Sequence, residues 1–170
     1  MTDALLPADM VALAARVIAE NAAIGRKIAL AESCTGGLVS AALTEIAGSS
    51  AVVECSFVTY SNNAKHQLLG VKTDIIDTFG AVSVACAWAM AQGALKHSKA
   101  DVAVAISGIA GPDGGTAQKP VGLVVFARAE RGVDKVTAEE RHFAPTSRAS
   151  VRADAAMCAL ELLLPAPREG

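Results

Sequence analysis

The sequence predicts a single α/β domain in which helices pack on the faces of a mixed β-sheet. Helical and strand-like patterns alternate along the chain, as in other α/β domains. The 170 residues are 52% hydrophobic, which is enough to fill a core. The strand-like segments 121–129 and 135–143 are joined too tightly for a crossover helix, so we expect an antiparallel hairpin there. We expect one domain over residues 1–170, with an ordered core at about 7–164.

The first third of the chain is expected to form two helices and two strands. Apolar residues recur at helical spacing over 7–21, which predicts an amphipathic helix. A short apolar run at 27–31 predicts a strand, and 35–46 is expected to be helical, closed by Gly48. The β-branched and aromatic residues of 52–60 predict a second strand.

The middle of the chain is expected to be mainly helical. Ser61 is a suitable N-cap for a helix that ends at Gly70, since serine favours the first position and glycine the last. A short helix is expected at 74–79. Ser83 is expected to cap a long helix over 84–97.

The last third contains the strongest strand signal. The continuously apolar run 101–106 predicts a buried strand. A Gly/Pro-rich loop, 107–120, leads from it into the hairpin. An amphipathic helix is expected at 147–164, ended by Pro165.

Composition narrows the classes of function. The net charge is −2 and no run of Lys or Arg occurs, which argues against binding along a nucleic-acid backbone. The N-terminus does not resemble a signal peptide, and no apolar run is long enough to span a membrane. The four cysteines include no C-x-x-C pair, and the three histidines lie far apart in sequence. We therefore expect a cytoplasmic protein with reduced thiols, no metal site and no cofactor.

The motif AESCTGGL, at 31–38, stands where the first strand hands over to a helix. Ligands of α/β sheets gather at the carboxyl ends of strands, and the N–H groups at a helix start favour an anion. Glycines at Gly36 and Gly37 allow close approach to the backbone. Two interpretations fit: Ser33 is a nucleophile beside an oxyanion site formed by the backbone from Thr35 to Gly37, or Ser33 or Thr35 simply caps the helix.

A nucleophilic serine needs a base, and Lys65 is the best candidate. It lies one helical turn beyond the strand that ends at Tyr60, which would place both residues at the same sheet edge as Ser33. Burial can keep a lysine neutral, although an ordinary solvated lysine is the common alternative. Ser61 is four residues before Lys65 and is a rival nucleophile, but we prefer it as a cap. A Ser-His-Asp triad is not excluded by residue order, but the histidines are poorly placed. Cys34 is expected to pack under the helix.

The second Gly-rich loop, 107–115, is long for a compact domain, which is typical of functional loops. Its glycines can present backbone donors to a phosphate or a carbonyl. Ser107, Gly108 and Gly111 are therefore candidate binding residues, while Asp113 is better explained as a turn former.

The motifs AESCTGGLVSAALTEIAGSS, VTYSNNAKHQLLGV, GAVS at 80–83, SGIAGPDGG and VGLVVFA together resemble the CinA C-terminal domain family. The resemblance extends from about Pro7 to Leu164. It implies an amidohydrolase of the stand-alone type, without the additional N-terminal domain of full-length members. Such an enzyme would convert nicotinamide mononucleotide and water to nicotinate mononucleotide and ammonia, in pyridine nucleotide salvage. The resemblance also implies a homo-oligomer, dimeric or larger.

The resemblance also assigns roles to residues. The catalytic serine of the E-S-x-T-G-G motif falls on Ser33, and the tyrosine and lysine of the Y-S-x-x-x-K motif fall on Tyr60 and Lys65. The G-I-A-G-P loop falls on 108–112. The F-x-G-[DN]-R motif is altered to FAPTSR, so its arginine, Arg148, is shifted by one position and is implied as a phosphate contact.

The predicted mechanism starts with attack of Ser33 on the carboxamide, with Lys65 accepting the proton directly or through Tyr60. The predicted partner is a small nucleotide, with no nucleic acid and no membrane. The alternative is a non-catalytic nucleotide-binding or regulatory module, associated with competence or DNA damage.

Overall fold

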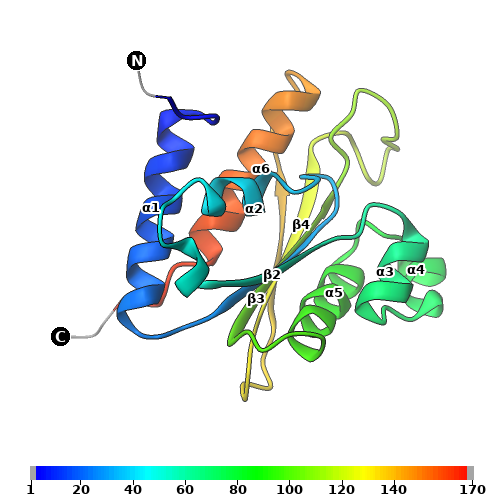
Figure 1. Ribbon diagram of the computed structural model, residues 1–170. Coiled ribbons are helices and arrows are strands. Elements are labelled where there is room, and N and C mark those ends of the chain that lie inside the picture. The colour runs from blue at the N-terminus through cyan, green and yellow to red at the C-terminus, as the bar shows by residue number, and fades with distance from the viewer. Residues whose placement is uncertain (1–2, 168–170) are drawn as a thin grey trace.

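One mixed sheet forms the centre of the molecule, for which the computed structural model describes residues 3–167 (Figure 1). Its strands are β1 (Ile28–Glu32), β2 (Val53–Val58), β3 (Val102–Gly108), β4 (Leu123–Glu130) and β5 (Thr137–His142). They lie in the order β2-β1-β3-β4-β5. Strand β1 is parallel to β2 and β3, whereas β4 is antiparallel to β3 and β5. The predicted mixed sheet and the predicted hairpin are therefore both confirmed.

Helices cover both faces of this sheet. They are α1 (Ala8–Ala23), α2 (Leu38–Thr44), α3 (Asn62–Leu69), α4 (Thr73–Phe79), α5 (Val84–Lys96) and α6 (Arg148–Leu162), with a 3-10 turn η1 (Ser49–Ala51). Helices α1, α2 and α6 cover one face, and α3, α4 and α5 lie on the other (Figure 1). Within residues 3–167, no helix is both long and apolar enough to cross a membrane.

The two faces differ in side-chain size because successive strand residues point to opposite faces. On β1, Ile28 and Leu30 pack with α1, α2 and α6, whereas Ala29 and Ala31 pack with α5. All four side chains are fully buried. The small alanines let α5 lie close to the sheet, and Gly93 of α5 touches the backbone of α3 so closely that a Cβ there would collide with it. The alanine-rich sequence thus serves close helix–sheet packing.

The predicted caps are confirmed. The Ser61 Oγ accepts a hydrogen bond from the N–H of Ala64 and starts α3, and Gly70 ends it in the left-handed conformation. The Ser83 Oγ accepts from the N–H of Cys86 in the same way and starts α5. These local signals fix where α3 and α5 begin.

The prediction for the helix at 35–46 is wrong at its start. Helix α2 begins only at Leu38, because Gly36 and Gly37 have φ angles of +59° and +97° and form a left-handed turn. The expected domain extent, 1–170, reaches beyond the described residues at both ends.

Candidate active site

A cleft of about 200 Å³ opens at the edge of the sheet where β1 and β3 end. Its walls include Ser33, Tyr60, Lys65, Ser107 and Arg148, which come from the strand ends, α3 and α6. Among the described residues, no aspartate or glutamate lines it. Two larger hollows of about 390 Å³ each lie elsewhere, but they are lined by no serine, threonine or cysteine.

Strand register brings the candidate nucleophile and base together. Glu32, the last residue of β1, is aligned with the last residue of β2, so Ser33 and Thr59 follow at the same edge. The first turn of α3 then carries Lys65 back over this edge. Its Nζ lies 3.1 Å from the Ser33 Oγ, 2.8 Å from the Thr59 carbonyl oxygen and 3.4 Å from the Tyr60 carbonyl oxygen.

The environment of Lys65 favours an uncharged amine. Its side chain is among the most buried in the molecule, at 1% exposure. Burial lowers the pKa of Lys65 below the ordinary lysine value, because removal from water disfavours the charged form. Across residues 3–167, no ion pair joins it to a carboxylate. A neutral amine has two N–H donors and one lone pair, and the two carbonyls and the Ser33 hydroxyl can satisfy all three.

The N-terminus of α2 already binds an anion, and that anion belongs to the protein. The Glu32 carboxylate is fully buried and accepts hydrogen bonds from the N–H groups of Val39 (3.0 Å) and Ser40 (3.1 Å). Ser56 Oγ donates to it at 3.4 Å. The expectation that these helix N–H groups are free for a ligand is therefore wrong. The signal available in the sequence was a carboxylate ending an apolar strand just before a helix, since the helix dipole stabilises such a charge.

The predicted oxyanion donors at 35–37 are not equivalent. The Gly36 N–H donates to the Ser33 carbonyl at 3.0 Å, so this donor is occupied within the turn. The N–H groups of Thr35 and Gly37 have no hydrogen-bond partner within residues 3–167. The Thr35 hydroxyl is also buried without a partner in that range. These two N–H groups therefore remain as candidate donors to a ligand.

Tyr60 and Arg148 form a second group at the mouth of the cleft. The Tyr60 side chain is 60% exposed, and its hydroxyl accepts a hydrogen bond from the Arg148 guanidinium at 2.8 Å. The same guanidinium donates to the Gly111 carbonyl at 2.7 Å. The Tyr60 hydroxyl is thus engaged with Arg148, while Lys65 reaches Ser33 without an intervening group.

The remaining candidates of the second loop lie at the base of the cleft. The Ser107 Oγ donates to the Ala81 carbonyl at 2.7 Å and holds β3 against the segment before α5. Gly108 lines the cleft beside it, and a Cβ at Gly108 would lie only 2.7 Å from the Val124 side chain. A glycine is therefore required here by the close approach of β4.

Sequence reasoning missed Arg152. This residue lies on α6 one turn after Arg148, and its guanidinium donates to the carbonyls of Cys34 (3.1 Å) and Thr35 (3.0 Å). The available signal was the four-residue spacing of the two arginines, which places both on one face of the helix.

The rival candidates are occupied by structural roles. The Ser61 Oγ accepts from the N–H of Ala64 as a helix cap. Burial raises the pKa of the Cys34 thiol to about 11, which leaves it protonated near neutral pH. His66 and His97 each bond to a backbone carbonyl through Nδ1.

The fold and the cleft define an α/β domain with a serine hydroxyl and a buried lysine amine in contact at the carboxyl ends of its strands. The model of the family described as the CinA C-terminal domain matches residues 10–166. The chain belongs to this family, as the sequence motifs predicted.

Several curated relatives are similar over most of the chain. Nicotinamide-nucleotide amidohydrolase PncC of Escherichia coli K12 is 50% identical over 139 residues, which cover 82% of this chain and 83% of that protein. The protein of the same name from Enterobacter agglomerans is 50% identical over 137 residues, covering 81% and 82%. A putative competence-damage inducible protein of Symbiobacterium thermophilum is 56% identical over 117 residues, 69% of this chain. The match spans only 27% of the length of that longer relative.

Solved structures are similar to the whole fold. The crystal structure of the competence/damage inducible protein CihA from Agrobacterium tumefaciens aligns with a TM-score of 0.90 at 50% identity, covering 94% of this chain and 96% of that one. A CinA-superfamily protein from Escherichia coli aligns with a TM-score of 0.85 at 32% identity, covering 95% and 94%. These similarities confirm the predicted fold class.

Proposed function

We propose that this protein hydrolyses the carboxamide of nicotinamide mononucleotide to give nicotinate mononucleotide and ammonia. The observation that carries the proposal is the contact of 3.1 Å between the buried Lys65 Nζ and the Ser33 Oγ, in a cleft lined by no carboxylate within the described residues. Support also comes from the half-identical relatives that bear the name nicotinamide-nucleotide amidohydrolase. A nucleophile beside a base is the arrangement that covalent amide hydrolysis requires.

In the first half of the reaction, the Ser33 Oγ attacks the carboxamide carbon and its proton moves to the neutral Lys65 Nζ. The negative charge that develops on the carbonyl oxygen is stabilised by the N–H groups of Thr35 and Gly37, which have no hydrogen-bond partner within residues 3–167. The C–N bond then breaks, and Lys65 returns the proton to the leaving nitrogen, which departs as ammonia. The product of this half is an ester between Ser33 and the nicotinoyl group.

In the second half, water attacks the ester and gives its proton to Lys65. The C–O bond to Ser33 breaks, the proton returns to the Ser33 oxygen, and nicotinate mononucleotide leaves. Each residue ends in its starting state, and neither half draws on a metal or a cofactor.

The charges around the cleft suit an anionic nucleotide. Arg148 lies at its mouth and no carboxylate lines it in the described range, so a phosphate meets attraction without opposing charge. We assign the phosphate to the Arg148 guanidinium and to backbone N–H groups of the loop that includes Gly108 and Gly111. The Tyr60 hydroxyl holds Arg148 in place for this contact.

We further place the reaction in cytoplasmic pyridine nucleotide salvage, carried out by a homo-oligomer without nucleic-acid or membrane partners.

The test is ammonia release by the purified protein from nicotinamide mononucleotide, nicotinamide riboside and free nicotinamide. We expect release from the mononucleotide, with an equal amount of nicotinate mononucleotide, and much slower release from the two compounds that lack the phosphate. Binding of the mononucleotide without ammonia release would contradict the proposal and would favour the non-catalytic, regulatory module. The competence-related names of some relatives are consistent with that alternative.

A further inference from the structure

We propose that Arg152 is a positioning residue that aims the N–H of Thr35 at the reacting carbonyl oxygen. Its guanidinium would do this by holding the carbonyl groups of Cys34 and Thr35 from a position on α6 outside the cleft walls. This inference rests on the proposed function, because an oxyanion donor matters only where Ser33 attacks a carbonyl group.

The contacts of Arg152 are specific to the turn that carries the nucleophile. The Nε donates to the Cys34 carbonyl at 3.1 Å, and a terminal nitrogen donates to the Thr35 carbonyl at 3.0 Å. A Cβ on Gly36 would lie 3.5 Å from that nitrogen, so the guanidinium lies directly against the turn. A planar guanidinium can hold two consecutive carbonyls at fixed angles, which a single ammonium group does less well.

The geometry of the peptide bond means that the contact at the Cys34 carbonyl fixes the direction of the Thr35 N–H group. In a trans peptide, the carbonyl and the N–H of the next residue point in opposite directions. The Cys34 carbonyl points to Arg152 on α6, so the Thr35 N–H points away from α6. Helix α6 covers one face of the sheet. Lys65 of α3 and Ala81, which precedes α5, line the cleft from the opposite face. The Thr35 N–H therefore points away from the Arg152 guanidinium, toward the face of the sheet on which α3 and Lys65 lie, and it has no hydrogen-bond partner within residues 3–167.

The turn needs such support because its sequence leaves it free to move. Gly36 and Gly37 both have positive φ angles, and glycine adopts many other conformations at little cost. Glu32 fixes the end of the turn at α2, by accepting from the N–H groups there. Arg152 fixes the end near Ser33.

Arg152 acts through the backbone and does not meet the substrate. Arg148 lines the cleft, whereas Arg152, one turn further along α6, is absent from its walls. Both its mapped contacts are to carbonyl groups of the turn. We therefore expect its loss to change the rate of the chemical step and to leave substrate binding nearly unchanged.

The experiment compares Arg152→Ala and Arg152→Lys with wild type, using nicotinamide mononucleotide as substrate. We expect the alanine variant to lose about 10- to 100-fold in kcat, by analogy with the loss of an oxyanion donor, with KM changed less than about threefold. The lysine variant should lie in between. Millimolar guanidinium should restore part of the kcat of Arg152→Ala without raising that of wild type. Arg16→Ala is the matched control, because Arg16 pairs with Glu20 on α1, and it should behave as wild type.

Two results would overturn the inference. The first is a kcat of Arg152→Ala within twofold of wild type, and the second is a rise in KM at unchanged kcat, which would make Arg152 a binding residue. If Arg152→Ala does not fold, as judged by circular dichroism, Arg152→Gln takes its place. Glutamine retains a donor for one of the two carbonyls, and the same limits on kcat and KM apply to it.

A second readout separates this inference from the proposed function. Phenylmethanesulfonyl fluoride labels a reactive serine by forming a sulfonyl ester with its oxygen, while fluoride leaves with the displaced proton. If wild type is labelled at Ser33 but releases no ammonia from nicotinamide mononucleotide, the proposed function has failed and the labelling rates decide the inference. We expect labelling of Arg152→Ala to be about 10-fold slower than that of Arg16→Ala. Equal rates, or no labelling of wild type at Ser33, would overturn it.

Discussion

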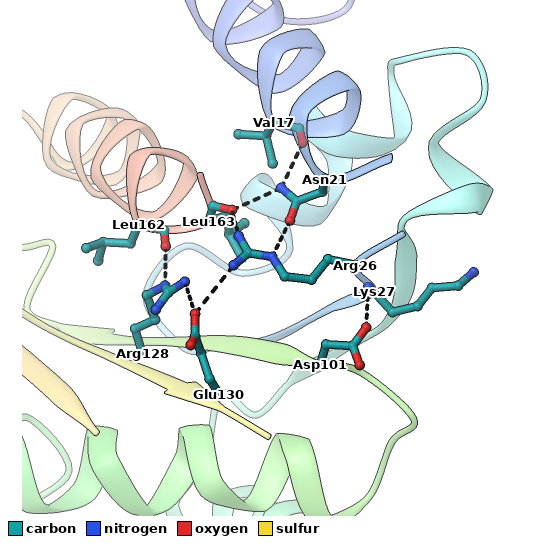
Figure 2. A network of polar contacts seen from close by, with 9 residues as sticks. All are labelled: Val17, Asn21, Arg26, Lys27, Asp101, Arg128, Glu130, Leu162 and Leu163. Carbon is teal, nitrogen blue, oxygen red and sulfur yellow. Dashed lines mark hydrogen bonds and ion pairs between the residues drawn. The ribbon is translucent and has the colours of Figure 1, made fainter. Parts of the chain in front are cut away.

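The two ends of helix α6 are both held by arginines, but the arginines are used differently. At its C-terminal end, Arg128 donates to the carbonyl of Leu162 at 2.8 Å, and Arg26 donates to the carbonyl of Leu163 at 2.9 Å (Figure 2). Both arginines also pair with the carboxylate of Glu130. The buried amide of Asn21 completes the network, as Figure 2 shows. Both arginines at this end therefore have a carboxylate beside them.

At the N-terminal end, the cations have no such partners. Within the described residues, Arg148 and Arg152 donate to backbone carbonyls and to the Tyr60 hydroxyl, and neither forms an ion pair. Lys65, which is 1% exposed, lines the same cleft as Arg148. Within the described residues, no ion pair therefore offsets the charges of Arg148 and Arg152.

The difference indicates which end does chemistry. Paired charges such as those of Arg26 and Glu130 stabilise the fold but leave little field for a ligand. Unpaired, partly desolvated cations cost stability, and they attract anions and shift pKa values. Each of the following variants should alter one end of α6 and leave the other intact. They are given from the largest expected effect on activity to the smallest.

Ser33→Ala should lower ammonia release about 10⁴-fold or more, because it removes the hydroxyl that contacts the Lys65 amine, whereas the Ser107 hydroxyl donates to the Ala81 carbonyl. The melting temperature should change little, since the Ser33 side chain makes no other mapped hydrogen bond. The control is Ser61→Ala, which removes the cap of α3 and should keep activity while losing about 1 kcal/mol of stability. If Ser61→Ala kills turnover and Ser33→Ala does not, the nucleophile is wrongly assigned.

Lys65→Met should lower kcat by about 10²- to 10⁴-fold, because the base is lost while the volume is kept. The same change should raise the free energy of unfolding at neutral pH. The pKa of Lys65 is lower in the folded chain than in the unfolded chain, so burial of this amine destabilises the wild-type fold. This destabilisation is full at pH values below the folded pKa of Lys65. It disappears as the pH rises toward the ordinary lysine value, and it amounts to about 1.4 kcal/mol for each unit by which the pKa is lowered.

Urea unfolding at several pH values measures the difference in free energy of unfolding between wild type and Lys65→Met. The gap in stability should narrow as the pH rises. A gap that widens with pH would show that Lys65 is stabilised as a cation in the folded protein.

Tyr60→Phe should have a moderate effect, mainly on KM. It removes the acceptor that holds Arg148 but not the contact between Lys65 and Ser33. We expect KM for nicotinamide mononucleotide to rise about three- to tenfold, with a smaller change in kcat, in line with one lost charge-assisted hydrogen bond. A fall in kcat beyond 100-fold at constant KM would instead make the Tyr60 hydroxyl a proton relay.

Arg128→Ala should affect stability alone. It removes donors to the Leu162 carbonyl and to Glu130, which should cost about 1–3 kcal/mol of the free energy of unfolding. The values of kcat and KM should stay within twofold of wild type at a temperature where the variant is folded. Thermal unfolding and the ammonia assay together measure this, and a large loss of activity in folded protein would mean that the two ends of α6 are coupled.

Local patterns were enough to predict most of the fold. Serine caps, C-terminal glycines and buried apolar runs act over a few residues, and Ser61, Gly70 and Ser83 lie where these patterns indicate. The tight connection before β5 was enough to predict the mixed sheet. The start of α2 was misplaced because Gly36 and Gly37 were included in a helix that their left-handed conformation excludes.

The parts of the site that were missed depend on contacts between distant residues. Arg152 is 118 positions from Cys34 in the chain, and its spacing from Arg148 indicates a shared helix face but not which turn that face contacts. The sequence indicates only that Glu32 ends a strand. The folded turn is what brings the N–H groups at the start of α2 to its carboxylate. The meeting of Ser33 and Lys65 was predictable because parallel strands place their ends at one edge, and α3 follows β2 directly.

The most direct test is to follow the ¹⁵N resonance of the Lys65 Nζ as a function of pH in the wild-type protein. We predict that Lys65 loses its proton below the pH at which the other lysines titrate, and that kcat/KM for nicotinamide mononucleotide rises with pH through the same midpoint. A Lys65 amine that stays charged over the whole range in which the enzyme works would contradict the account.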